Sequence, residues 1–187
     1  MKRDQRASFV HPQKRRLTGI VLLGGTTVLA SYAYSLGFDP ARQVALWGGV
    51  PYSWLPAYVS SMALATIGYF AFTFFLLVRA DPGTVRIAQR LGYGLFSWLY
   101  LMILAPSALW LPLTLAMVQQ PNDFLWLAVR LVLLTVGFGS VALLLALLSL
   151  RPRTPVRAYW LAVTGGVAFC LQTAVLDLFV WTAFFPA

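Results

Sequence analysis

The sequence has almost no residue types that carry acid–base, redox or metal chemistry. It contains no Glu, one Cys (Cys170) and one His (His11), and its five acidic residues are all Asp. A single Cys cannot form a disulfide within the chain, and one Cys with one His cannot supply the ligands of a zinc site. The same scarcity excludes a His-box oxygenase or a Ser–His protease. We therefore expect no protein-ligated metal and, because no nucleophile–base pair is visible, no enzymatic activity.

Charge is also scarce. Charged residues make up 10% of the chain, where soluble domains carry about 25%. Hydrophobic residues make up 60% and the mean hydropathy is +0.77. A helix needs about 20 apolar residues to cross hydrocarbon about 30 Å thick. Five segments meet that length, so the sequence predicts an all-α integral membrane protein, a five-transmembrane-helix bundle, with spans at 17–38, 55–78, 93–118, 124–150 and 158–185.

Basic residues give a net charge of +9 and gather in three regions. They lie in an N-terminal arm (1–16), in the connection after residue 78 and in the connection after residue 150, which a five-span chain places on one side. Cytoplasmic loops are enriched in Lys and Arg, so we predict a cytoplasmic N-terminus and a C-terminus outside, with residues 17–187 as one domain. Such loops bind anionic lipid headgroups, and nucleic acid is not an expected partner. The preference for Arg over Lys is typical of GC-rich bacterial genomes, which points to a bacterial cytoplasmic (inner) membrane.

One acidic residue, Asp177, interrupts the apolar run TAVLDLFVW. An ionised Asp in hydrocarbon costs several kcal/mol, so it is expected to face the bundle interior. Small residues that recur every four positions before it define a packed helix face that includes Asp177. They are Ala162, Gly166, Cys170 and Ala174. Arg130, about 9 Å deep in the preceding span, is a candidate ion-pair partner, and a protonated Asp177 bonded across helices is the alternative.

The third span carries a polar and aromatic face at a similar depth. Ser107 and Trp110 share that face, and Pro106 and Pro112 free backbone carbonyls that need other partners. Trp54 stands at the outer start of the second span. Aromatic walls with one or two polar anchors can hold a flat or largely apolar molecule in the outer half of the bundle.

Three patches resemble the TspO/translocator-protein family of small, Trp-rich, basic five-helix proteins. The patches are PYSWLPA (51–57), SALWLP (107–112) and LDLFVW (176–181), although Ala57 replaces a family Pro and Ser107 and Asp177 replace family Asn residues. The resemblance implies a pocket for porphyrins or sterol-like molecules, capped by the loop between the first two helices. Carried over by position, its ligand-binding residues are Trp54, Ser107, Trp110, Asp177 and Trp181. We add Arg130, whose depth would let it meet an acidic ligand group such as a propionate.

The leading functional hypothesis is binding of a hydrophobic or tetrapyrrole-like ligand, such as a porphyrin, by a sensor, carrier or scavenger. One alternative is an accessory structural subunit of a larger membrane complex. Another is a small proton- or ion-coupled transporter that uses Asp177. The sequence leaves open the identity of the ligand and whether the protein forms a homodimer or joins a larger complex.

Overall fold

A computed structural model describes residues 11–37 and 40–185. It contains five helical spans, each long and apolar enough to cross a membrane, as the sequence predicts. The helix type changes within two of these spans: the second comprises η2, α3 and η3, and the fifth comprises α6, η4 and α7. In order, the elements are α1 (Pro12–Leu36), α2 (Pro40–Ala45), η2 (Tyr52–Trp54), α3 (Leu55–Phe74), η3 (Phe75–Arg79), β1 (Arg86–Ile87), α4 (Leu95–Gln119), α5 (Asp123–Leu148), β2 (Leu150–Arg151), α6 (Val156–Cys170), η4 (Leu171–Trp181) and α7 (Thr182–Phe184).

The first helix begins earlier than predicted. His11 is its N-cap, because His11 Nδ1 accepts a hydrogen bond from the backbone N–H of Gln13 at 3.3 Å, and Pro12 occupies the first helical turn. Lys14, Arg15 and Arg16 therefore belong to α1. These residues are the last part of the predicted basic arm (1–16), of which residues 1–10 lie outside the described part of the chain.

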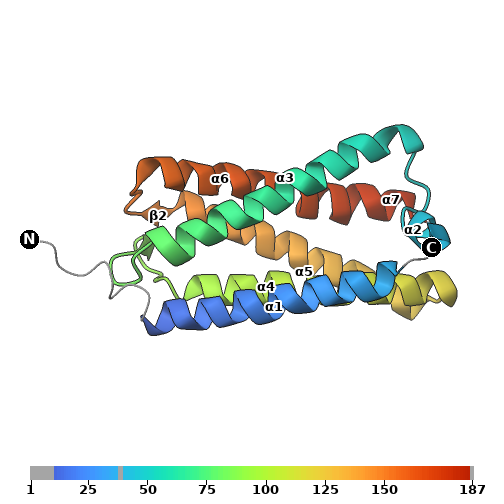
Figure 1. The fold of residues 1–187 in the computed structure, drawn as a ribbon, viewed down its shortest axis with the longest axis horizontal. Helices are drawn as coiled ribbons and strands as arrows, with labels where there is room; N and C mark the ends of the chain where they lie inside the picture. Colours follow the sequence, from blue (N-terminus) through green and yellow to red (C-terminus); the bar gives the residue numbers. More distant parts are fainter. Residues whose placement is uncertain (1–10, 38–39, 186–187) are drawn as a thin grey trace, which may run out of the picture.

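The central element of the bundle is α5. Figure 1 shows it between two helix pairs, α6 with α3 on one side and α4 with α1 on the other. The final span continues through η4, a π-helix, which also packs against α5. The buried side chains of η4 face α5: Thr173 donates a hydrogen bond to Ser140 Oγ at 2.7 Å.

The basic connections meet at one end of the bundle. β1 pairs antiparallel with β2, so the connections after the second and fourth spans are joined where α1 begins. We call this the basic end, and the opposite end, which carries α2 and α7, the far end (Figure 1). Guanidinium groups at the basic end lie over aromatic rings, 5.2 Å from the centroid for Arg16 over Trp98 and for Arg153 over Tyr159. That the basic end is cytoplasmic remains a prediction.

The core is divided into a basic-end part and a far-end part. In the basic-end part, the hydroxyls of three fully buried Tyr residues, Tyr93, Tyr100 and Tyr159, are hydrogen-bonded within the bundle. Tyr93 donates to the carbonyl of Leu76 at 2.9 Å, and the hydroxyls of Tyr100 and Thr73 lie 2.7 Å apart. Hydrocarbon supplies no partner for such groups, so these contacts hold the spans in register.

Two glycines allow α3 and α6 to cross closely. A Cβ added to Gly68 would lie 2.3 Å from the backbone oxygen of Gly165, and a Cβ on Gly165 would lie 2.7 Å from Gly68 Cα. The small-residue pattern of the last span included the neighbouring Gly166, and the sequence gave no sign of Gly68. Gly25 of α1, by contrast, has nothing within 4 Å of its added Cβ.

We predict that Gly68→Ala lowers the stability of the bundle by roughly 1–3 kcal/mol, because the new methyl group meets backbone that cannot give way. Thermal unfolding of the detergent-solubilised protein, followed by circular dichroism, measures the change. Gly25→Ala is the matched control and should melt with the wild type or slightly above it. Equal melting of the two variants would contradict a close α3–α6 crossing.

Candidate functional site

Three indole rings from three spans meet in the far-end core. The Trp181 ring lies 5.7 Å from the Trp110 ring of α4 and 6.3 Å from the Trp126 ring of α5. Phe185 stacks in the same group, 4.4 Å from Trp181. Trp181 is only 2% exposed. We call Trp110, Trp126, Trp181 and Phe185 the aromatic cluster.

The connection between the first two spans closes over this cluster. Trp181 Nε1 donates a hydrogen bond to the carbonyl of Leu46 at 3.0 Å. The backbone N–H of Gly49 donates to the carbonyl of Phe184 at 2.9 Å. We call residues 46–50 the capping loop. Its Trp47 ring packs edge-on against Tyr58 of α3, with the centroids 5.6 Å apart.

Asp177 lies on η4, partly buried, where its Oδ1 accepts a hydrogen bond from Gln172 Nε2 at 2.8 Å. Residues five apart on an α-helix point about 140° away from one another. A π-helix, with its i to i+5 bonding, brings them to the same side. No described Lys or Arg side chain comes within 4.0 Å of Asp177. The ion pair with Arg130 that the sequence left open is therefore not formed.

Three polar side chains interact with Asp177, and we call Asp177, Gln172, Tyr32 and Tyr58 the polar layer. The hydroxyls of Tyr32 on α1 and Tyr58 on α3 lie close enough to Asp177 to interact with it electrostatically. Tyr58 also donates a hydrogen bond to the carbonyl of Leu176. The Tyr32 ring lies 6.1 Å from the Trp110 ring, which links the layer to the cluster. Asp177 thus faces groups from α1 and α3 as well as its own helix.

Two buried polar atoms in this region have no hydrogen-bond partner among the described residues. One is the indole donor Trp110 Nε1, and the other is the amide acceptor Gln172 Oε1. Gln172 is 5% exposed, so solvent does not reach its side chain in the folded bundle. Buried polar atoms in proteins are nearly always hydrogen-bonded. This region therefore has one donor and one acceptor that could each bind a further group.

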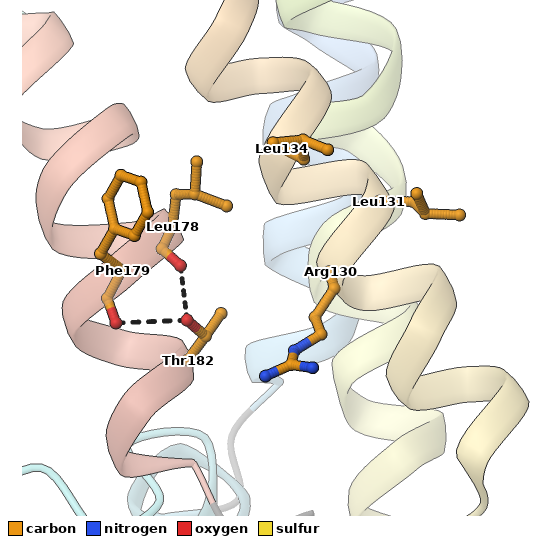
Figure 2. A pocket seen from close by; sticks show the side chains of 6 residues that line it. All are labelled: Arg130, Leu131, Leu134, Leu178, Phe179 and Thr182. Carbon is orange, nitrogen blue, oxygen red and sulfur yellow. Dashed lines mark hydrogen bonds between the residues drawn. The ribbon is translucent and has the colours of Figure 1, made fainter.

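Arg130 lies apart from the polar layer, on the outer surface of α5. Its Cζ atom is 5.0 Å from the centroid of the Trp126 ring, one helical turn earlier. Beside it runs an open groove of about 270 Å³ between α5 and the final span. Figure 2 shows the six groove residues: Leu178, Phe179 and Thr182 lie on the final span, and Arg130, Leu131 and Leu134 lie on α5, where the Arg130 side chain extends toward the final span.

The two remaining predicted residues do not join the cluster. Trp54 is 48% exposed at the far end, with its ring 5.6 Å from that of Phe184. Ser107 is partly buried on α4, three residues before Trp110. The six predicted residues therefore occupy four places: Trp110 and Trp181 in the cluster with Ser107 nearby on α4, Asp177 in the polar layer, Arg130 at the groove, and Trp54 on the rim.

Sequence reasoning missed three residues of the site. Trp126 was not among the predicted site residues, although Arg130 four residues later offered a signal for a ring–cation pair on one helix face. Gln172 could not be linked to Asp177, because their contact depends on π-helical winding. Phe185 stood at the predicted end of the last span, where its inward direction is set by the capping loop.

Comparison of the chain with protein-family models, curated proteins and solved structures finds no match. The resemblance to the TspO/translocator-protein family thus remains a prediction from three short patches. In the described part of the chain, no three His, Cys, Asp or Glu side chains come together as a metal site would require.

We predict that Trp181→Phe frees the capping loop, because the substitution keeps an aromatic ring but removes the N–H that binds the Leu46 carbonyl. Amide hydrogen exchange of peptides covering residues 44–50, measured by mass spectrometry in detergent, should accelerate severalfold. Trp160→Phe, at an exposed position near the basic end, is the control and should leave these peptides unchanged. Unchanged exchange in Trp181→Phe would show that this bond does not hold the loop.

Proposed function

We propose that the protein binds a hydrophobic small molecule, with flat tetrapyrrole-like compounds as the leading class, at the far end of the bundle. The observation that carries the proposal is that two buried polar atoms have no partner among the described residues: Trp110 Nε1, within the cluster of three indoles, and Gln172 Oε1, on the side chain that donates to Asp177. The chain itself leaves these atoms unsatisfied, and a bound molecule can supply their partners.

The energetics favour an occupant with a large apolar surface and few polar groups. An unpaired buried donor or acceptor costs roughly 1–3 kcal/mol, and the surrounding hydrocarbon offers no water to relieve it. Indole rings provide broad faces for stacking, and Asp177 provides an acceptor for a ligand N–H. A tetrapyrrole combines these features, since it has a wide apolar face and a small number of polar groups.

Access would require the capping loop to move. Trp181 and Phe185 fill the centre of the cluster, with their ring centroids 4.4 Å apart. The loop is tied to the last span by the Leu46–Trp181 and Gly49–Phe184 hydrogen bonds. Breaking two such bonds costs only about 1–3 kcal/mol in total, so opening is within reach of a ligand's binding energy. A ligand would therefore stabilise an opened arrangement of loop and rings.

The role that fits this arrangement is that of a sensor, carrier or scavenger. Asp177 is bonded to an amide and lacks the paired base or nucleophile that catalysis needs. A membrane-embedded site next to a movable loop suits capture and release of a molecule that partitions into the bilayer.

We predict that protoporphyrin IX binds the protein in nanodiscs, with saturable quenching of Trp fluorescence and a shift of the porphyrin absorbance band. Trp181→Leu should raise Kd at least tenfold, about 1.4 kcal/mol, because stacking area is lost at the centre of the cluster. Asp177→Ala should also raise Kd, because a hydrogen-bond acceptor is lost. Trp54→Leu should have a smaller effect, since its ring lies on the rim.

Trp160→Leu, an exposed position near the basic end, is the matched control and should bind porphyrin as the wild type does. Absorbance is the deciding readout, because each Trp variant also removes part of the fluorescence. Quenching that never saturates, with the same absorbance in every variant, would mean that the porphyrin dissolves in the lipid.

A further inference from the structure

Arg130 is an uncompensated cation inside a membrane span. It stands seven residues after the start of α5, which places its Cα about 10 Å along the helix. No carboxylate among the described side chains lies within 4.0 Å of its guanidinium. A charged side chain at such depth is costly unless it finds a partner. The contact with the Trp126 ring engages the guanidinium face and leaves its N–H donors free.

The groove beside Arg130 is apolar and opens on the outside of the bundle. Four of its six lining residues are Leu or Phe. Its Thr182 hydroxyl is already used, since it bonds to the carbonyls of Leu178 and Phe179 on its own helix (Figure 2). The guanidinium is thus the remaining polar group of the groove. Its volume of about 270 Å³ lies just below the range of pockets that enclose drug-sized ligands. It suits part of a slender chain better than a macrocycle.

The charged group of the groove lies nearer the far end of the bundle and its apolar side chains lie deeper, as the headgroup and acyl chains of a lipid do. In Figure 2 the Arg130 side chain extends toward the far end, while Leu134 lies further from that end. Long basic side chains in membranes reach toward the headgroups in this way. A guanidinium binds a phosphate through two parallel N–H···O bonds, so the phosphate is the group that matches Arg130.

We propose that this groove binds one anionic glycerophospholipid of the surrounding bilayer. Its headgroup phosphate lies on the Arg130 guanidinium, and one acyl chain lies along the wall of Leu131, Leu134 and Phe179. An anionic lipid is favoured over a zwitterionic one because it brings no cation of its own to the site. The inference does not depend on the proposed function, because the groove lies outside the aromatic cluster.

Native mass spectrometry of the full-length protein in detergent tests the site, with phosphatidylglycerol as the probe. The wild type should retain one phosphatidylglycerol molecule that Arg130→Gln loses, with at least a fivefold fall in the lipid-bound fraction. Leu134→Trp should cause a similar fall, because it fills the groove while keeping the charge. Arg90→Gln, at the basic end, is the matched control and should keep the lipid.

Competing molecules separate the sources of the phosphate. A diacylglycerol with the same chains should not replace phosphatidylglycerol, and glycerol phosphate without chains should not displace it. Equal lipid retention in the wild type, Arg130→Gln and Leu134→Trp would overturn the proposal, as would displacement by glycerol phosphate. Displacement by equimolar protoporphyrin IX would assign the groove to the small-molecule site and would also overturn it. Should Arg130→Gln fail to fold, Leu134→Trp and the competition experiments still decide.

Discussion

The constraint on which this structure depends is that hydrocarbon offers no hydrogen-bond partners. Every polar group within the spans must find one inside the protein, and most do so: Thr173 binds Ser140, and the Trp181 indole binds the Leu46 carbonyl. These bonds fix which helix faces meet and how the outer connection folds back. The few buried side-chain atoms of the described residues that remain unsatisfied are spread along the bundle, from Ser97 Oγ and Arg153 Nε near the basic end to Trp110 Nε1 in the aromatic cluster. Trp110 Nε1 belongs to the aromatic cluster, and Gln172 Oε1 is on the side chain that donates a hydrogen bond to Asp177.

The two binding sites proposed at the far end differ in their chemistry. The interior site consists of the aromatic cluster and the polar groups around Asp177. The exterior groove has apolar walls and one cation, Arg130. Trp126 lies between them, since its ring contacts both Trp181 and Arg130. Trp126 therefore belongs to the aromatic cluster and also contacts the cation of the groove. Occupancy of one site could be read in the position of that ring at the other.

The sequence predicted the parts of this structure that depend on composition and helical period. Five spans, the gathering of basic loops at one end and the meeting of Trp110 with Trp181 follow from apolar length, charge and the depth of each residue. The partner of Asp177 could not be predicted, because the α-helical period separates it from Gln172 and only π-helical winding unites them. The outward direction of Arg130 was equally hidden, since a single Arg carries no information on which side of its helix will face a groove.

The pairing of β1 with β2 joins two connections at the basic end, and the contact of Gly68 with Gly165 brings α3 against α6 partway along their length. Beyond that crossing, the far-end connection is fastened to the last helix by two hydrogen bonds. The α3–α6 crossing thus lies between two fastened ends, the β1–β2 pairing at the basic end and the capping loop at the far end. A tilt of either helix at one end is therefore opposed at the crossing before it reaches the other end.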